Sequence, residues 1–502
     1  MNICTFLENS ARDYPDNIAI VYREQRVDYR TLSMLVNSLA GTLTGHGVKK
    51  GDRVILLLEN SIHYAAWYFA VLRVGGVVVA LNTDTTVKEV EYVLSSCQPK
   101  GVITNKACCQ YLPENNNVDF RIIAVEGLDT LDQSIAVCPI IEVDEGDDLA
   151  QIIYTSGTTG KPKGVMLTHL NLSSNTESIV EYLRLTSDDK IMVVLPFFYS
   201  YGNSLLLTHI MAGGTLIISY QFVFLNKVLE MMINEKATGF AGVPSSYAML
   251  LHKSNIRGLK FPHLRYMTCA GGALSPANII ELKKILPCVD YYAMYGQTEA
   301  TARLLYLEPD QWMERLGSAG KAIPGVELRV MAKDGQDVRI GEIGEIVACG
   351  LNIMKGYWGD PEATREVLKD DGLHTGDLAR IDEDGYIFIA GRQSDMIKAG
   401  AFRIHPQEIE DVIIEMPEVV ECAVAGIPDE IMGEKVKAFV VLQADLCLDE
   451  KDILRYCKKN LPEYKVPKVV EFVDSLPRTT SGKIKRYALK EENSKHEYRN
   501  TK

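Results

Sequence analysis

Tyr154-Thr-Ser-Gly-Thr-Thr-Gly-Lys-Pro-Lys-Gly164 combines glycines, hydroxyl side chains and two lysines in one short stretch. Glycines let a loop bring its backbone N–H groups close to an anion, while hydroxyls add donors and lysines add positive charge. The apolar run 151–154 predicts a strand before this stretch, and the residues after it predict a second strand and a helix near 171–183. We therefore expect a loop at a strand end that binds a polyphosphate.

Two other interpretations of this loop are possible. A P-loop of the form G-x-x-x-x-G-K-[ST] does not fit, because only two residues separate Gly157 from Gly160 and a proline follows Lys161. Clusters of Gly, Ser, Thr and Lys also form ordinary solvated turns. The loop alone does not decide between a phosphate site and a turn, so other segments are needed.

The size and composition of the chain are those of a multi-domain globular protein. Its 502 residues exceed one ordinary domain, and 47% hydrophobic with 24% charged residues exclude a largely disordered chain. No apolar run approaches the length of a membrane span. The net charge of -13 argues against nonspecific binding to nucleic acid or acidic lipid, so we expect small-molecule substrates.

The cysteines and the chain ends indicate a reducing compartment. The 11 cysteines lack C-x-x-C spacing, so they predict neither a zinc site nor a disulfide framework, and the adjacent Cys108 and Cys109 are expected as reduced thiols. The N-terminus lacks a basic stretch followed by a long apolar one, and the C-terminus lacks a peroxisomal tripeptide. We expect a cytoplasmic location.

Short β-branched runs alternate with helical patterns and predict an α/β fold with layered sheets and helices; these runs are 54–58, 77–80, 190–196 and 214–219. A boundary is expected near 391–395, where a strand at 386–390 ends. The region beyond it predicts helices at 406–416 and 450–460 and strands at 419–425 and 436–442. We expect a large N-terminal domain over 1–393 and a small α+β C-terminal domain over 394–502.

Four further segments contain groups that nucleotide chemistry needs. In Tyr295-Gly-Gln-Thr-Glu299 the ring can stack on a base, the threonine can donate to a phosphate and the glutamate can bind magnesium. The carboxylate of Asp377 can accept bonds from ribose hydroxyls, and the guanidinium of Arg392 can reach ribose or phosphate. Lys483, at the end of a Gly/Ser/Thr-rich turn, can stabilise developing phosphate charge. Taken singly, each is more simply a turn or a solvated charge.

Together and in this order, the segments resemble the adenylate-forming superfamily, which includes acyl- and aryl-CoA synthetases, adenylation domains of nonribosomal peptide synthesis and beetle luciferase. The resemblance covers almost the whole chain and includes the segments 27–32, 73–76, 344–346, 397–400 and 461–467. It implies two steps. A carboxylate attacks the α-phosphate of ATP and releases pyrophosphate, and a thiol then attacks the acyl-adenylate to give a thioester and AMP.

The resemblance also implies roles for individual residues. Thr298 is expected at the α-phosphate, Glu299 at magnesium, and Lys483 between the carboxylate and the phosphate. The ribose is expected at Asp377 and Arg392. The adenine is expected between Tyr295-Gly296 and the turn Gly271, Gly272 and Ala273. The β- and γ-phosphates are expected at the loop residues Thr155, Ser156, Gly157, Thr158, Thr159, Gly160, Lys161 and Lys163.

The family rotates its small, mobile C-terminal domain between the two steps, which would bring Lys483 in and then withdraw it. The hinge position of the family falls on Ser394, which departs from the charged or amide side chain often found there. After rotation, the turn with Lys398 and Gly400 would face the thiol tunnel, where glycine lets a pantetheine arm pass close to the backbone.

By the same resemblance, the substrate pocket is formed by 196–203, with Gly242 and the residues after it opposite. Tyr199 stands where many acyl- and aryl-CoA synthetases carry histidine and amino-acid-activating domains carry aspartate, which argues against an α-amino acid. Ser200, Asn203 or a carbonyl could still accept a hydrogen bond from an amine or imino group. Tyr199 and Phe198 are also explained as core packing.

Three functions remain open at this point. The first is an acid–thiol ligase that uses ATP, Mg²⁺ and coenzyme A. The second is a stand-alone adenylation enzyme that loads an amino or imino acid, for example a proline-like one, onto the phosphopantetheine of a carrier protein acting in trans. The third is a non-catalytic sensor of nucleotide or acyl-adenylate. Retention of Lys483, Glu299 and Asp377 argues against the sensor. The sequence identifies neither the acid nor the acceptor.

Overall fold

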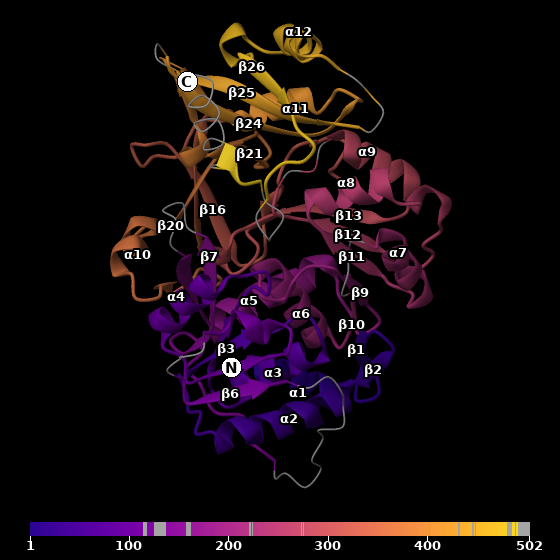
Figure 1. Ribbon diagram of the computed structural model, residues 1–502, viewed down its shortest axis with the longest axis vertical. Helices are drawn as coiled ribbons and strands as arrows, with labels where there is room; N and C mark the ends of the chain where they lie inside the picture. Colours follow the sequence, from indigo (N-terminus) through magenta and orange to yellow (C-terminus); the bar gives the residue numbers. More distant parts are fainter. Residues whose placement is uncertain are drawn as a thin grey trace.

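The computed structural model describes residues 1–113, 118–124, 137–156, 162–219, 222, 224–272, 274, 276–400, 402–429, 432–443, 446, 448–478, 484–486 and 488–489. These residues form layered sheets and helices below a smaller unit of strands and helices at the C-terminal end (Figure 1). The predicted α/β class and the separate C-terminal domain are thereby confirmed.

The largest sheet has the order β15-β14-β13-β12-β11-β9-β10-β1-β2. Its neighbours from β1 to β13 along this path are parallel, and β14, β15 and β2 add antiparallel edges. Because parallel strands run in one direction, their carboxyl ends meet at one edge. The strands are β1 (Ile18–Tyr22), β2 (Gln25–Asp28), β9 (Lys190–Val193), β10 (Thr215–Ile218), β11 (Gly239–Gly242), β12 (Tyr266–Cys269), β13 (Asp290–Tyr295), β14 (Leu305–Leu307) and β15 (Lys321–Ala322).

A second sheet of seven strands carries the glycine-rich loop between two of its strands. The antiparallel pair β7 and β8 places Thr155 opposite Lys163, and β18 extends the sheet beyond β8. The predicted strands at 54–58, 77–80 and 151–154 are confirmed within about one or two residues. The strands are β3 (Arg53–Leu57), β4 (Val77–Ala80), β5 (Gly101–Thr104), β6 (Phe120–Ile123), β7 (Leu149–Ser156), β8 (Pro162–Thr168) and β18 (Gly356–Tyr357).

The main core joins these two sheets through helices α1 (Cys4–Asp13), α2 (Tyr29–Gly45), α3 (Ile62–Arg73), α5 (His169–Leu183) and α6 (Ser200–Ala212). Every residue of α3 except His63 is buried, as its apolar sequence demands. Other helices cover the outer faces of the sheets: α4 (Val87–Cys97) on the second sheet and α7 (Leu225–Asn234), α8 (Pro244–Lys253) and α9 (Pro276–Ile285) on the first. Both sheets are thus covered on two sides, which suits their parallel strands.

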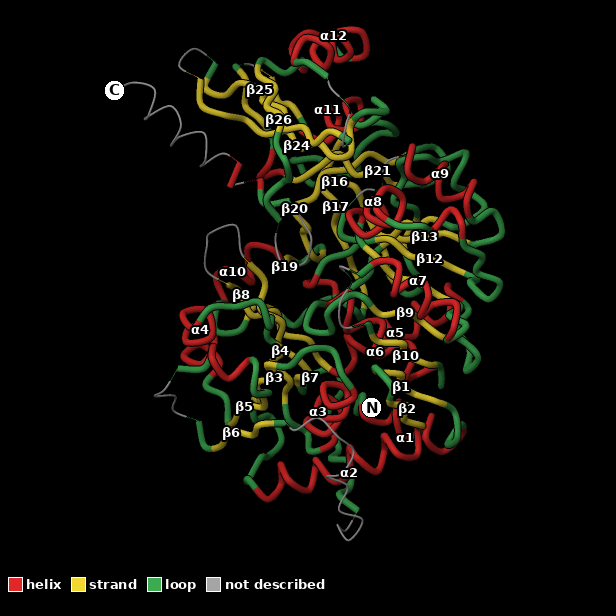
Figure 2. The backbone as a smooth tube through the Cα atoms, turned by 45° about the vertical axis from the view of Figure 1, so that its right-hand side comes forward, coloured by secondary structure: helices red, strands yellow, loops and turns green. Residues whose placement is uncertain are grey.

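The third sheet leads into the C-terminal unit. It consists of β16 (Val326–Met331), β17 (Ile343–Gly350), β20 (Gly372–Ile381) and β19 (Leu368–Lys369), with β21 (Ile387–Arg392) paired to β20 and α10 (Pro361–Val367) beside it. The C-terminal sheet has the order β23-β22-β25-β24 with β26 on β25, and α11 and α12 lie with it at the top of Figure 2. These elements are β22 (Ile397–Ala399), β23 (Phe402–Ile404), α11 (Pro406–Ile413), β24 (Val419–Asp429), β25 (Gly433–Leu442), α12 (Glu450–Asn460) and β26 (Val469–Phe472).

Three details of the C-terminal unit differ from the sequence expectation. α11 ends at Ile413, three residues before the predicted end, β24 continues to Asp429 instead of ending at 425, and β25 begins at Gly433 instead of 436. The cause of the second difference is pairing, because β24 and β25 remain in register as far as Asp429 and Gly433. α12 has the predicted bounds and begins with a capping box between Asp449 and Asp452.

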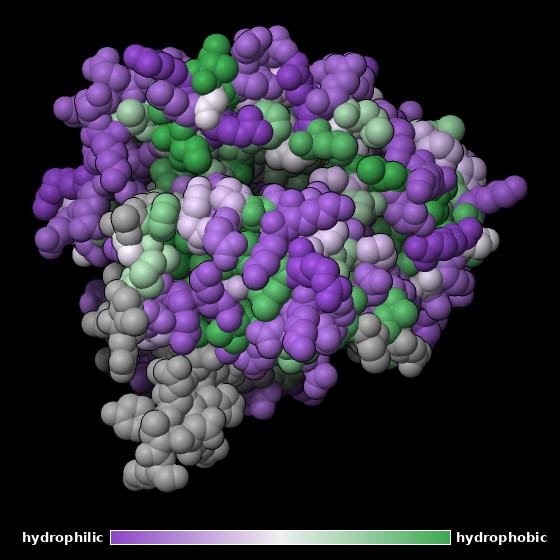
Figure 3. Space-filling view, turned by 90° about the horizontal axis from the view of Figure 1, so that it is seen from above, coloured by the Kyte–Doolittle hydropathy of each residue, from purple (hydrophilic) through white to green (hydrophobic). Residues whose placement is uncertain are grey.

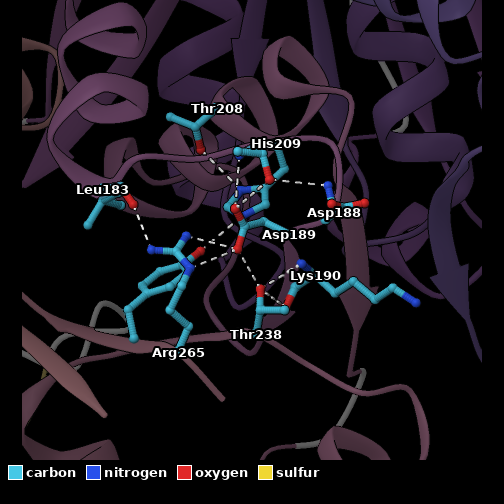
Figure 4. Close-up of polar contacts among 10 residues, drawn as sticks. Leu183, Asp188, Asp189, Lys190, Thr208, His209, Thr238 and Arg265 are labelled. Carbon is cyan, nitrogen blue, oxygen red and sulfur yellow. Dashed lines mark hydrogen bonds and ion pairs between the residues drawn. The ribbon is translucent and has the colours of Figure 1, made fainter. Parts of the chain in front are cut away.

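The amino ends of the parallel strands are tied together by the carboxylate of Asp189 (Figure 4). It accepts hydrogen bonds from Thr238 Oγ1 at 2.8 Å, from Arg265 Nη2 at 2.9 Å and from the backbone N–H of Thr186 at 2.9 Å. Burial alone would raise the pKa of Asp189, but the bonds from Arg265, Thr186 and Thr238 lower it overall. This edge is therefore a structural anchor, which leaves the opposite edge for ligands.

The surface, the helices and two cysteines can be compared with the predictions of a chain without a membrane span and of reduced thiols. Viewed from above, the face in Figure 3 is mostly hydrophilic, with hydrophobic side chains in small separate groups. Within the described part of the chain, no helix combines the length and apolar character that crossing a bilayer requires. Cys108 and Cys109 are free thiols, as expected.

Candidate active site

The predicted nucleotide and pocket residues follow the carboxyl ends of the parallel strands. Ser200 lies beyond β9, Gly242 ends β11, Gly271 lies beyond β12 and Tyr295 ends β13. Parallel order alone brings these four positions to one edge of the sheet. Open α/β sheets bind their ligands outside this edge.

Asp377 is the centre of a hydrogen-bonded group at this edge. Tyr295 Oη donates to its Oδ2 at 2.6 Å, and Arg392 Nε donates to its Oδ1 at 3.0 Å. The second contact follows from the pairing of β20 with β21, which places Asp377 directly opposite Arg392. The sequence predicted all three residues, but it did not predict that the tyrosine hydroxyl binds the aspartate.

This arrangement determines the charge of its members. Burial and then the charge of Asp377 raise the pKa of Tyr295 far above its usual range, so the phenol remains a neutral donor. The charge of Asp377 raises the pKa of Arg392 as well, more than burial lowers it. The carboxylate is buried while the guanidinium is about half exposed, at 46% of its side-chain surface. One face of the group is therefore open to a ligand.

Glu299 and Thr298 lie on the short helix η3 (Thr298–Ala300), directly after β13. Tyr357 Oη donates to Glu299 Oε1 at 2.8 Å, while none of the residues described in the structure donates to Oε2. Thr298 Oγ1 is 3.5 Å from Ser200 Oγ, a contact that joins η3 to the first turn of α6. Thr298 and Glu299 thus present one hydroxyl and one carboxylate oxygen at the same edge as Asp377.

Tyr357 is a site residue that sequence reasoning missed. Burial and then the Glu299 charge raise its pKa far above the usual value for a phenol. Its ring lies 4.9 Å from Lys163 Nζ, so it contacts both the predicted magnesium ligand and the predicted phosphate loop. The two-residue strand β18 positions it by pairing Tyr357 with Val165. No local sequence motif marks so short a strand. The signal nearest to it in the sequence is Trp358, because tryptophan is rare in this chain.

The glycine-rich loop is described at its two ends. Thr155 and Lys163 face each other across β7 and β8, and Gly164 accepts a hydrogen bond from Trp358 N at 2.7 Å. Gly157, Thr158, Thr159, Gly160 and Lys161 lie outside the described residues, as does the side chain of Ser156. The predicted strand–loop–strand is confirmed at its ends, and the phosphate role of the loop stays a prediction.

The turn after η3 is held in an unusual backbone conformation. Thr301 has φ +66°, and its Oγ1 donates to the carbonyl of Asn352 at 2.7 Å. Asn352 Nδ2 in turn donates to the carbonyls of Ala300 and Arg303 at 3.2 and 3.1 Å. Positive φ in a threonine costs free energy, so these bonds fix a turn that would not form alone. The turn sets the position of Glu299.

The predicted substrate segment has both exposed and buried members. Tyr199 and Ser200 are partly exposed at the start of α6, whereas Phe198 is 6% exposed and belongs to the core. Asn203 is 2% exposed, and its Oδ1 accepts a hydrogen bond from Tyr68 at 3.4 Å. The amide of Asn203 therefore faces the core. The sequence had predicted Asn203 as a group of the substrate pocket. Gly242 is buried at the end of β11.

The described ends of the adenine turn and of the thiol turn are exposed. Gly271 and Gly272 are exposed, with φ +86° at Gly271, while Ala273 lies outside the described residues. Gly400 has φ +59°, and its N–H donates to Met432 O at 2.7 Å. Lys398 is exposed and Ser394 lies on η4 (Gln393–Asp395), the first element after β21. The predicted boundary between 393 and 394 lies inside η4, one residue beyond the end of β21 at Arg392, and stays a prediction.

Lys483 lies outside the described residues, but both neighbouring segments are anchored. Arg478 and Ile484 form an antiparallel bridge, and Arg478 Nη2 donates to Glu421 Oε1 at 2.6 Å. Arg486 binds both oxygens of the buried Glu410 at 2.8 Å, and its Nε is 3.5 Å from Asp395 Oδ2. The segment before Lys483 is thus bound to β24, and the segment after it to α11 and to the helix of the predicted hinge.

Comparison with known proteins identifies the family. Residues 7–358 match the model of the AMP-binding enzyme family, and residues 408–483 match the C-terminal domain of AMP-binding enzymes. The chain belongs to the AMP-binding enzyme family. It is an adenylate-forming acid–thiol ligase, as the ordered motifs predicted. The chain is 36% identical to a feruloyl-CoA synthase of an Amycolatopsis species over 475 residues, which is 94% of this chain and 95% of the relative.

Solved structures of this enzyme family agree in fold over the full chain. The o-succinylbenzoate CoA synthetase of Bacillus subtilis, in complex with its acyl-adenylate intermediate, superposes with a TM-score of 0.85 at 29% identity over 97% of each chain. The same synthetase in complex with ATP and magnesium gives 0.83 over 97% of this chain and 99% of that one. An anthranilate CoA ligase in complex with anthranoyl-AMP gives 0.90 at 27% identity over 98% and 97%.

Proposed function

We propose that this protein activates a small carboxylic acid with ATP and Mg²⁺ and transfers the acyl group to coenzyme A. The observation that carries this proposal is the hydrogen-bonded group of Asp377, Tyr295 and Arg392 together with Glu299. None of the residues that the structure describes donates a hydrogen bond to Oε2 of Glu299. A ribose site and a magnesium ligand on adjoining elements are what an adenylating enzyme requires. The similarity of the chain to CoA synthetases and CoA ligases supports coenzyme A as the acceptor.

Asp377 and Arg392 are proposed to bind the ribose. Each oxygen of Asp377 already accepts one bond, from Tyr295 or from Arg392, and each has a second lone pair for a ribose hydroxyl. The two existing donors hold the carboxylate in one orientation, so little entropy is lost when the nucleotide binds. Adenine is proposed between Tyr295 and the turn at Gly271 and Gly272, where absent side chains permit close approach of the backbone.

Glu299 fits a magnesium site of the kind that nucleotides bring with them. No group of three or more His, Cys, Asp or Glu side chains with metal-binding geometry occurs among the described residues. Magnesium bound with a nucleotide takes one or two carboxylates, and phosphates and waters complete its shell. Glu299 Oε2 is available for this, while Tyr357 fixes the orientation through Oε1. The ion would offset phosphate charge.

The proposed first step forms a bond from a carboxylate oxygen of the acid to the α-phosphorus and breaks the bond to the β-phosphate oxygen, so pyrophosphate leaves. Thr298 is proposed to donate to an α-phosphate oxygen and Lys163, beside Tyr357, to attract the leaving pyrophosphate. Lys483 is proposed to bring its positive charge between the two anions, whose repulsion is the main barrier to their approach.

In the proposed second step the sulfur of coenzyme A attacks the acyl carbon and AMP leaves with the carbon–oxygen electron pair. Rotation about Ser394 would exchange Lys483 for the turn with Lys398 and Gly400, whose missing side chain leaves room along the backbone. Tyr199 carries no charge to pair with a substrate ammonium, which favours a simple acid over an amino acid. A carrier protein acting in trans is the competing acceptor.

The test is ATP–pyrophosphate exchange with a panel of carboxylic and amino acids, followed by thioester formation with coenzyme A or with a holo carrier protein. We expect acid-dependent exchange and AMP release that requires coenzyme A. Exchange followed by loading of the carrier protein only would replace coenzyme A as the acceptor. Absence of exchange with every acid, in a protein that still binds ATP, would reject the ligase proposal and favour a sensor.

A further inference from the structure

Arg303 is a fully buried cation next to the predicted substrate segment. It is 2% exposed and follows η3 by three residues. Its guanidinium carbon lies 4.1 Å from the centroid of the Tyr201 ring, on the first turn of α6. No sequence motif singles it out, and nothing in the proposed chemistry so far uses it. A buried guanidinium therefore needs an explanation.

The partners of Arg303 do not balance its charge. Nε donates to Met294 Sδ at 3.2 Å, Nη2 to Ser204 Oγ at 3.3 Å and Nη1 to the carbonyl of Ala302 at 3.5 Å. In the part of the chain that the structure describes, no carboxylate forms an ion pair with it. A guanidinium has five N–H donors and keeps its charge at all ordinary pH values. The hydroxyl of Tyr182 also forms a hydrogen bond with the guanidinium. At least one donor is therefore unused, and burying an uncompensated charge is expensive.

Hydrogen bonds hold the backbone of Arg303 in one position, which restricts the positions that its side chain can take. Asn175 and Asn352 both donate to its carbonyl, at 3.0 and 3.1 Å. A Cβ atom on Gly296 would lie 2.0 Å from the carbonyl oxygen of Ala302, so the chain packs directly against the segment that carries Thr298 and Glu299. Such support is typical of a side chain that must meet a ligand in one geometry.

Helix α6 gives the distance between the proposed α-phosphate position and the guanidinium of Arg303. Ser200, which touches Thr298, and Ser204, which touches Arg303, are one helical turn apart, or about 6 Å along the axis. Tyr199, Ser200 and Tyr201 are partly exposed, whereas Ser204 is buried. The first turn of α6 thus leads from the proposed α-phosphate position down to the guanidinium.

We propose that Arg303 selects the acid by binding a second oxygen of the substrate, a carboxylate or carbonyl oxygen placed roughly 6 Å from the reacting carboxyl group. This inference rests on the proposed function and names its substrate class as small acids with a distal oxygen acceptor. Such an oxygen accepts a hydrogen bond from an unused N–H donor. An apolar acid of equal shape leaves this N–H donor without an acceptor and without water. Such an acid is therefore expected to be a much poorer substrate.

Three acids of matched shape provide the probes: glutarate, 5-oxohexanoate and 5-methylhexanoate, which end in a carboxylate, a ketone and a branched alkane. The wild-type enzyme and the variants Arg303→Met and Arg303→Lys are assayed by pyrophosphate exchange, with thermal unfolding of each protein measured without ligand. The wild-type enzyme is expected to prefer the best oxygenated acid over 5-methylhexanoate by about ten- to a hundredfold in kcat/KM. Arg303→Met is expected to lose that preference.

Two features separate this role from a structural one. Arg303→Met is expected to unfold at no lower temperature than wild type, because the cation has no carboxylate partner to lose. It is expected to use 5-methylhexanoate with a higher kcat/KM than wild type, because no unpaired N–H donor remains beside the alkyl end. Arg303→Lys is expected to keep part of the preference for glutarate, through charge, and lose that for the ketone, which needs the planar fork.

The outcomes distinguish this inference from the proposed function. Exchange with an unchanged acid preference in Arg303→Met, or a wild-type preference for 5-methylhexanoate, would overturn the role of Arg303 and leave the ligase proposal intact. A lower unfolding temperature with uniform loss on all three acids would also overturn it, in favour of a structural role. Absence of exchange with these three acids and with every acid of the panel would reject the proposed function itself.

Discussion

The hydroxyl of Tyr295 donates to Asp377 across 82 residues of sequence, at 2.6 Å. The bond orients a carboxylate that is proposed to bind ribose, so Asp377→Asn is expected to lower kcat/KM for ATP in pyrophosphate exchange by about a hundredfold, and Tyr295→Phe by about tenfold. Tyr306→Phe is the matched control, because none of the residues that the structure describes forms a hydrogen bond with the Tyr306 hydroxyl, and the Tyr306 ring stacks on Tyr182. Equal loss in both tyrosine variants would contradict the role of the Tyr295 hydroxyl.

The bond from Tyr357 to Glu299 predicts a dependence on magnesium. Glu299→Gln is expected to raise the magnesium concentration needed for half-maximal exchange by more than tenfold, because an amide oxygen is a weaker ligand for this hard cation. Tyr357→Phe is expected to raise it by about tenfold, since the outer partner orients the ligand. Magnesium titrations of the initial rate measure both, with the exposed Glu362→Gln as the control. If the Tyr357 variant changed the ATP requirement alone, its link to the metal would be wrong.

Gly164 is expected to tolerate no side chain. A Cβ atom there would lie 3.0 Å from Ile152 Cγ2 and 3.2 Å from both Trp358 Cβ and Tyr154 Cζ. Gly164→Ala should therefore push β18 away from β8 and lower the free energy of unfolding by about 1–3 kcal/mol. Gly258→Ala is the comparison, because nothing lies within 4 Å of a Cβ atom there. Urea unfolding measures the difference, and equal stability of the two variants would show that the neighbours move easily.

His209 predicts loss of stability in acid. Its Nδ1 donates to the carbonyl of Leu205 at 3.0 Å, and its Nε2 accepts from Tyr266 Oη at 3.1 Å, which suits the neutral ring. Burial lowers its pKa from 6.5 to about 4. The unfolded chain then binds more protons between these values, so stability is full above pH 6.5 and falls, by at most about 1.4 kcal/mol per pH unit, toward pH 4.

The measurement for His209 is urea unfolding between pH 4 and pH 7.5 in wild type, His209→Gln and His263→Gln. The His209 variant is expected to be less stable at neutral pH and to lose less stability on acidification than wild type. His263 is exposed and serves as the control. Parallel pH profiles for wild type and His209→Gln would assign the acid sensitivity to other groups.

The buried carboxylate of Glu410 pairs with the partly exposed guanidinium of Arg486. Arg486→Met would leave the Glu410 carboxylate without its cation, which is expected to cost about 3–5 kcal/mol in the stability of the C-terminal unit. Combining Arg486→Met with Glu410→Met is expected to restore most of this loss, because no buried charge remains. Unfolding followed by proteolysis of the C-terminal unit measures both variants, and additive losses in the double variant would contradict the pairing.

The sequence was informative wherever a signal is local. Strands at 77–80 and the helix at 450–460 have the predicted bounds, because β-branched runs and a capping box act over a few residues. Asp377 and Arg392 contact each other because β20 pairs with β21, and Thr298 and Glu299 follow the end of β13. The nucleotide roles of these four residues stay predictions. The bond between Tyr295 and Asp377, and the positions of Tyr357 and Arg303, depend on how distant strands and helices are placed side by side. No pattern within one segment contains that information.

The ion pairs of Arg486 have a consequence for recombination between related enzymes. Asp395 precedes the C-terminal sheet and Arg486 follows it, yet the two side chains lie 3.5 Å apart, and Glu410 lies between them in sequence. A chimera joined before Ser394 inherits all three charges from one parent, whereas a junction between Asp395 and Glu410 mixes them. The exchangeable piece of this chain therefore begins with the residues of the predicted hinge, and a functional graft carries its own hinge with it.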